Sequence, residues 1–208
     1  MTANTADYLW FEERFPDLAE AYCITLVHGV SPVELLRRLG GRAEPARTGI
    51  PALVEAAYDF YAPFSGTRTL FGMTPIGPWT LMVEPNGWHG VNEEKALPAS
   101  VDARWISHYD NSNANNDGSF LWAENKDRHL QFDLRGACYR NGSHPDELLD
   151  VIRRLGFEFP EEPTTTDDLD TDLAIPAAFA LAEHLTQVRL MPTHLQDTAF
   201  VCGGAEIK

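Results

Sequence analysis

The spacing of apolar residues predicts helices at the start of the chain. Between residues 7 and 28, apolar side chains recur every three or four positions, which is the spacing of one helix face. We expect a helix from about Pro16 to Val27, ended by the glycine of His28-Gly29 in the left-handed conformation. The capping box Ser31-Pro32-Val33-Glu34 predicts a second helix from Pro32 to Leu39, so the two would form a helical hairpin.

The period of the pattern changes after residue 61. A polar connector from Gly41 to Gly49 precedes a third predicted helix, Ile50 to Tyr61. Residues 67–134 then read as strands joined by short turns, which indicates antiparallel pairing. The predicted strands are Thr69–Met73, Trp79–Glu84, Arg104–Tyr109, Ser119–Ala123 and Arg128–Phe132.

The last third of the chain returns mostly to helix. Helices are predicted from Glu147 to Leu155 and from Ile175 to Thr186, with one more turn at Thr193 and a final strand from Thr198 to Cys202. We therefore predict a single α+β domain over residues 1–208, with a central antiparallel sheet of about five strands flanked by N-terminal and C-terminal helices. Its parts would be helical 7–61, strand-rich 67–134 and helical 143–208.

Charge narrows the classes of partner. The chain has 31 acidic against 16 basic residues, a net charge of -15, and Glu158–Asp172 has no basic residue. Because nucleic acids and anionic membranes attract basic surfaces, we expect neither as a partner, and a basic protein would be favoured. The plainer interpretation is that the acidity keeps the protein soluble.

Cysteine usage and the N-terminus suggest a cytoplasmic protein. The chain has three cysteines, Cys23, Cys138 and Cys202, which are too few and too widely spaced for a disulfide framework, so we expect them to be reduced. The first ten residues lack the basic and apolar regions of a secretion signal. Cytoplasmic location is the resulting expectation.

One tight corner supplies most of the candidate binding residues. Pro85-Asn86-Gly87 predicts a turn after the strand that ends at Glu84, and this turn would carry Trp88 and His89 off the strand end. We therefore name Glu84, Asn86, Trp88 and His89 as candidate binding residues. The simpler interpretation of Trp88 is a lid on the core.

Two further candidates lie outside the corner. Asp110 opens the polar segment that runs to Gly118, and Arg140 precedes a predicted helix start where it could hold an anion. A plain loop and an ordinary ion pair are the simpler interpretations. His108, Asp110 and His129 could in principle ligate a metal, but their spacing is not that of a typical metal motif. We predict no metal, no cofactor and no catalytic residues.

Several segments together resemble an actinobacterial family of cytoplasmic proteins of unknown function. The matching segments are W-F-E-E-R-F-P-D-L-A-E-A-Y-C (10–23), G-V-S-P-V-E-L-L-R-R-L-G (29–40), W-T-L-M-V-E-P-N-G-W-H-G (79–90), R-N-G-S-H-P-D-E-L-L (140–149) and F-A-L-A-E-H-L-T-Q-V-R-L (179–190). The resemblance covers nearly the whole chain and implies no activity or catalytic residue. The chain departs from it around Asn111–Gly118.

Two hypotheses for function follow. The first is a non-enzymatic protein-binding module of the immunity or antitoxin type, which would neutralise a basic partner; a permanent accessory subunit is a variant of it. The alternative is an enzyme or small-ligand-binding protein with a pocket between the sheet and the helices. The first is favoured because the sequence contains no recognisable catalytic motif.

Overall fold

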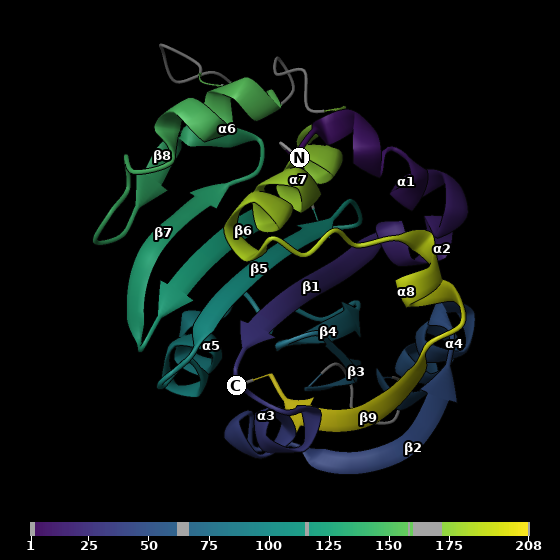
Figure 1. Ribbon diagram of the computed structural model, residues 1–208. Helices are drawn as coiled ribbons and strands as arrows, with labels where there is room; N and C mark the ends of the chain where they lie inside the picture. Colours follow the sequence, from purple (N-terminus) through teal and green to yellow (C-terminus); the bar gives the residue numbers. More distant parts are fainter. Residues whose placement is uncertain (1–2, 62–66, 115–116, 158, 160–171, 208) are drawn as a thin grey trace.

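One strongly curved antiparallel sheet organises the protein (Figure 1). The computed structural model describes residues 3–61, 67–114, 117–157, 159 and 172–207. The strand order is β2-β9-β3-β4-β1-β5-β6-β7-β8, so the prediction of about five strands is wrong, although antiparallel pairing is confirmed. The strands are β1 (Ala21–His28), β2 (Arg42–Thr48), β3 (Arg68–Ile76), β4 (Trp79–Pro85), β5 (Arg104–Asn111), β6 (Asp117–Glu124), β7 (Asp127–Asp133), β8 (Gly136–Asn141) and β9 (Ala199–Glu206).

The central strand β1 replaces most of the helix predicted over residues 16–27. Only Pro16–Ala19 is helical there, and β1 pairs with β4 on one side and β5 on the other. The side chains of Tyr22 and Ile24 enter one core and that of Cys23 enters the other, because successive residues of a strand face opposite sides. A strand buried on both faces is apolar throughout, and that pattern imitates the stripe of a helix.

The segment predicted as a connector, Gly41–Gly49, contains the edge strand β2. Its side chains are mostly exposed and polar, and its pairing with β9 shifts register between Glu44 and Arg47, where Pro45 lies. An edge strand tolerates proline and polar residues because one of its sides has no partner strand. The assignment of 7–61 as helical is therefore wrong at both β1 and β2, whereas β9 confirms the final strand predicted from Thr198 to Cys202 and extends it to Glu206.

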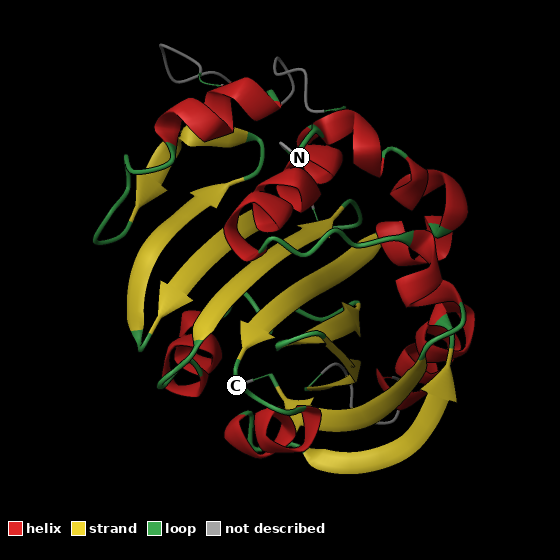
Figure 2. Ribbon diagram, in the orientation of Figure 1, coloured by secondary structure: helices red, strands yellow, loops and turns green. Residues whose placement is uncertain are grey.

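Helices cover both faces of the sheet (Figure 2). They are η1 (Thr5–Tyr8), α1 (Trp10–Arg14), α2 (Pro16–Ala19), α3 (Pro32–Arg38), α4 (Ile50–Tyr61), α5 (Glu93–Ala99), α6 (Leu149–Leu155), α7 (Ala174–Thr186) and α8 (Pro192–Gln196). The predicted helices after residue 30 are confirmed, whereas α5 was not foreseen. Leu18, Leu53 and Phe179 bring α2, α4 and α7 into the larger core, while Leu35 and Ala96 bring α3 and α5 into the smaller one.

Helix α7 lies across the middle strands of the sheet (Figure 1). Phe179 anchors it, since its ring centroid lies 4.6 Å from that of Phe11, 5.3 Å from that of Tyr8 and 4.5 Å from that of the His108 ring on β5. This packing holds the C-terminal end of α7 near the end of β1 and the start of β5. Among the described residues, no helix is long and apolar enough to cross a membrane.

Candidate functional site

The predicted corner after β4 exists, but its polar side chains are enclosed. Asn86 adopts a positive φ of 51°, as a turn there requires. Glu84 and His89 are 0% and 1% exposed. Glu84 Oε2 accepts hydrogen bonds from the backbone N–H of His89 (3.0 Å) and from His89 Nδ1 (2.8 Å), and Oε1 accepts one from Gly90 N–H (2.9 Å). The Glu84 carboxylate thus binds the backbone of residues 89 and 90 to the end of β4.

Beneath this corner the packing is too tight for a ligand. A methyl group on Gly90 would lie 2.0 Å from Thr25 Oγ1 and 2.7 Å from Cys23 Sγ, and Trp105 Nε1 donates to the Gly90 carbonyl at 2.7 Å. Burial, aided by the negative charge of Glu84, raises the pKa of the Cys23 thiol well above its usual value, so it stays protonated. We infer that Cys23 is a packing residue.

Electrostatics at the corner favour a charged pair. Burial lowers the pKa of His89, but the charge of Glu84 and the hydrogen bonds to Glu84 and the Glu206 carbonyl together outweigh burial, so this pKa is raised. Trp88 is half-buried and packs against the smaller core, and Asn86 is half-buried. The structure thus joins Glu84 and His89 in a structural contact and leaves Asn86 and Trp88 partly exposed, while the role of all four in binding stays a prediction.

Asp110 lies in a different place, at the base of an acidic cavity. Its carboxylate forms an ion pair with Arg135 Nη2 at 2.5 Å, and both residues are buried. The cavity has a volume of about 370 Å³ and is also lined by Glu12, Glu20, Asp172 and others. Burial, followed by the charges of Asp110 and Asp172, raises the pKa of Glu12, which shows that negative charge accumulates here.

The other candidates are dispersed. Arg140 pairs with Asp146 at 2.5 Å, which is the ordinary ion pair considered above. His108 Nδ1 lies 3.1 Å from the Tyr22 hydroxyl under α7, whereas His129 lies beside Asp127 and His144. His108, Asp110 and His129 are therefore not assembled as one metal site. Apart from residues 159 and 172, the acidic segment Glu158–Asp172 lies outside the described residues.

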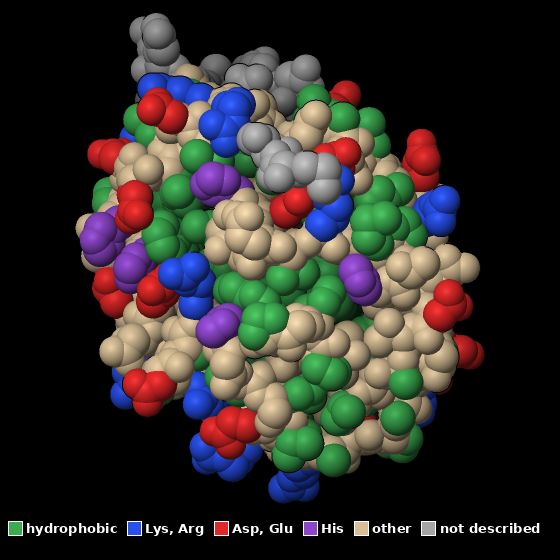
Figure 3. Space-filling view, viewed as in Figure 1, with side chains coloured by type: hydrophobic (Ala, Val, Ile, Leu, Met, Phe, Trp, Pro, Cys, Tyr) green, Lys and Arg blue, Asp and Glu red, His purple; other side chains and the backbone are tan. Residues whose placement is uncertain are grey.

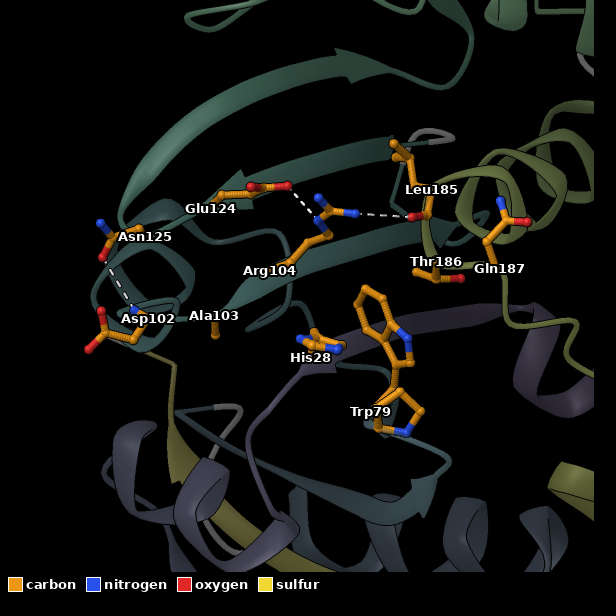
Figure 4. A pocket seen from close by; sticks show the side chains of 11 residues that line it. His28, Trp79, Asp102, Ala103, Arg104, Glu124, Asn125, Leu185, Thr186 and Gln187 are labelled. Atoms are coloured by element: carbon orange, nitrogen blue, oxygen red, sulfur yellow. Dashed lines mark hydrogen bonds and ion pairs between the residues drawn. The ribbon is translucent and has the colours of Figure 1, made fainter.

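A cavity of about 700 Å³, which the sequence did not reveal, opens between the strand ends and α7 (Figure 4). The end of β1, the start of β4, the start of β5 and the end of β6 meet here, because neighbouring strands are antiparallel. Its lining residues are His28, Pro78, Trp79, Asp102, Ala103, Arg104, Glu124, Asn125, Leu185, Thr186 and Gln187. The last three close the cavity from the C-terminal end of α7.

Polar and aromatic groups are fixed around this cavity. Arg104 Nε lies 2.5 Å from Glu124 Oε1, and Arg104 Nη1 donates to the Leu185 carbonyl at 3.4 Å, so the guanidinium links the sheet to α7 (Figure 4). The His28 ring meets the Trp79 ring edge-on, with centroids 5.0 Å apart. In the same view the Trp79 ring stands beside His28, on the side toward α7.

The rim of the cavity stores backbone strain. Asp102, Asn125 and Gln187 adopt φ values of 51°, 48° and 59°, and they are three of the five non-glycine residues with positive φ in the described part of the chain. The left-handed conformation is less stable than the right-handed one by about 1–2 kcal/mol per residue, and the difference is smaller for asparagine and aspartate. Asn125 belongs to the two-residue turn between β6 and β7 and Gln187 is the left-handed C-cap of α7, so these conformations shape the rim of the cavity.

The comparisons with known proteins place the chain in a family. A family of unknown function (DUF6461) matches residues 1–208. The chain belongs to this family. No curated protein and no solved structure matches it. DUF6461 membership therefore confirms an uncharacterised family, as the resemblance implied, and the function has to be argued from the geometry.

Proposed function

We propose that this DUF6461 protein binds a small, polar, ring-containing ligand in the cavity between the strand ends and α7. The observation that carries the proposal is the cavity of about 700 Å³ with Trp79 and Arg104 on its wall. A volume in this range is typical of sites for small molecules, which combine apolar walls with a few fixed polar groups. The second hypothesis also placed a ligand between sheet and helices, but none of the predicted binding residues lines this cavity.

The chemistry of the wall narrows the ligand class. The Arg104 guanidinium is already neutralised by Glu124, so the cavity does not present an unpaired cation to an anionic ligand. The rings of His28 and Trp79 suit a flat or ring-shaped group, and the side chains of Asp102 and Asn125 supply hydrogen-bonding groups. A neutral ring compound rich in hydroxyl or amide groups, such as a saccharide or nucleoside, fits these features.

We expect Arg104→Leu to weaken ligand binding by about tenfold or more, because a charge-assisted hydrogen bond contributes about 1.5–3 kcal/mol. A panel of saccharides and nucleosides would be screened by ligand-observed NMR, and the affinity of each hit measured by calorimetry. Trp79→Phe keeps an aromatic wall but removes the indole and should also weaken binding. Trp88→Phe, at the corner after β4, is the matched control and should bind as the wild type does.

The ligand proposal fails if no compound of these classes binds, or if hits bind Arg104→Leu and Trp79→Phe with unchanged affinity. The second outcome would mean that the compounds bind elsewhere. Thermal unfolding of each variant checks that the fold is intact.

A second candidate function, recognition of a basic protein, is supported by the acidic cavity at Asp110. The net charge of -15 and the carboxylates around this cavity would attract a lysine or arginine side chain of a partner. The immunity-type role, the actinobacterial origin and the cytoplasmic location are parts of this same proposal, and they rest on sequence alone.

We expect a basic partner to co-purify with the tagged protein from its host at about 50 mM salt and to leave near 500 mM, where screening shortens the reach of charge. The double variant Glu12→Gln and Glu20→Gln should recover less partner. Glu55→Gln with Asp59→Asn removes the same charge from exposed positions on α4 and is the control. Equal recovery with both double variants would exclude the acidic cavity as the contact.

A further inference from the structure

Three side chains of metal-ligand type gather where the end of β8 returns along β7. One ligand atom from each of Asp127, His129 and His144 lies within 4.8 Å of the other two. None of these residues lines the cavity of Figure 4. Histidine side chains gather over β7 and the loop after β8, at the left of the face shown in Figure 3, with acidic side chains beside them. The group is therefore reachable from solvent.

The backbone is shaped to bring His129 to this group. Trp122 of β6 pairs with Leu130, but the next residue, Ala123, pairs with Arg128, which leaves His129 as the extra residue of a β-bulge. Bulges re-aim a side chain and are enriched beside functional sites. The His129 ring packs on the Trp122 ring at 4.7 Å, so its orientation is fixed.

Gly142 allows His144 to approach His129. Gly142 has a φ of +133°, and a methyl group there would lie 2.3 Å from the His129 carbonyl oxygen. Past this close approach, Ser143 N–H donates to the Arg128 carbonyl (2.8 Å) and His144 N–H donates to the His129 carbonyl (2.9 Å). These bonds hold the two imidazole rings stacked, with centroids 4.6 Å apart.

The hydrogen bonds of Ser143 leave a free nitrogen on His144. The Ser143 hydroxyl donates to Asp127 Oδ2 at 2.5 Å, and its oxygen lies 2.8 Å from His144 Nδ1. Since the single hydroxyl proton goes to Asp127, His144 Nδ1 must carry the proton of the second bond. His144 Nε2 then keeps its lone pair, and because His144 is exposed its ring can turn out of the stack on binding and bring this nitrogen to an ion held by Asp127 and His129.

The distances suit a small transition-metal ion. Two ligands bound 2.0–2.1 Å from a tetrahedral zinc ion lie about 3.3 Å apart. His129 Nε2 lies 3.5 Å from Asp127 Oδ2, close to this spacing before any metal has bound. Asp127 and His144 are exposed and can adjust, whereas the Nδ1 of His129 is buried and has no hydrogen-bond partner. Nε2 is therefore the nitrogen of His129 that can face an ion.

We propose that Asp127, His129 and His144 form a binding site for a divalent transition-metal ion of the zinc type, oriented by Ser143. Two imidazoles and one carboxylate leave a fourth position of a tetrahedral ion open to water or to an external ligand. From the sequence we predicted no metal, because His129 was considered only together with His108 and Asp110. Those two residues lie elsewhere in the fold, and the site proposed here uses other partners of His129. It also stands independently of the proposed ligand cavity.

The test is calorimetric titration of the untagged protein with Zn²⁺, together with the visible absorption of bound Co²⁺. We expect one ion per chain. His129→Ala and His144→Ala should each weaken Zn²⁺ binding by tenfold or more, and Ser143→Ala by about tenfold, because outer hydrogen bonds orient the ligands. His184→Ala removes a partly exposed histidine of α7 that lies outside the group and outside the proposed ligand cavity, and it should leave the affinity unchanged.

The proposal is overturned if the wild type binds neither ion, or if His144→Ala keeps full affinity. His144 is exposed in the loop after β8, so its removal tests the site even if His129→Ala, which loses packing on Trp122, does not fold. Loss of affinity in His184→Ala as well would show general binding to surface histidines and would equally overturn the proposal.

Discussion

Glu84→Ala should lower the free energy of unfolding by about 3–5 kcal/mol, the usual cost of breaking a buried charged pair by removing one partner. The buried carboxylate accepts three hydrogen bonds, two from His89 and one from Gly90. Its removal leaves both backbone N–H groups and the His89 ring without that acceptor in a closed interior. Urea unfolding followed by circular dichroism measures the loss.

Glu94→Ala is the matched control for this variant. Glu94 is exposed in the first turn of α5, so the same chemical change should cost only about 0.5 kcal/mol or less. A loss below about 1 kcal/mol for Glu84→Ala would contradict the structural role of the corner, since such small effects are typical of surface positions. A binding role for Glu84 would then become the better explanation.

The second large effect is acid sensitivity caused by His108. Burial lowers the pKa of His108 from 6.5 to about 3. The ring therefore stays neutral in the folded protein while it binds a proton in the unfolded chain below pH 6.5. Its contribution to stability is complete above pH 6.5 and is lost as the pH falls towards 3, at about 1.4 kcal/mol per pH unit. Between pH 7 and pH 5 we expect a loss of about 2 kcal/mol from this residue.

His108→Asn isolates this contribution. The variant loses packing against Phe179 and should be less stable than the wild type at pH 7. Its free energy of unfolding should nevertheless fall less steeply between pH 7 and pH 5, by about the 2 kcal/mol assigned to His108. Parallel curves for wild type and His108→Asn would contradict the account.

Local signals in the sequence predicted the elements that lie on the outside of the fold. The capping box at Ser31 places α3, and Gly156, which adopts a left-handed φ of 93°, ends α6. The strand β1 could not be recognised in the same way. Its residues are apolar on both faces because helices cover both sides of the sheet, and this tertiary context cannot be read from the spacing of its apolar residues.

At the candidate sites, too, local turns could be predicted from the sequence, whereas contacts between distant segments could not. The turn at Asn86 was predictable, but the burial of Glu84 depends on how residues 87–90 fold back over Thr25 and Ser107. The cavity of Figure 4 depends on strand register, which pairs His28 with Trp79 and Arg104 with Glu124. His129 and His144 meet only because of a bulge and a glycine. No sequence motif records these contacts.

We infer that ligands bind in the cavity at the strand ends rather than at the corner after β4. Chemical-shift mapping on the ¹⁵N-labelled protein, titrated with a hit from the saccharide and nucleoside panel, tests it most directly. The amides of Ala103, Asn125 and Gln187 should shift with ligand concentration, while those of Trp88 and Gly90 should not. Shifts confined to Trp88 and Gly90 would contradict it and return the binding role to the corner.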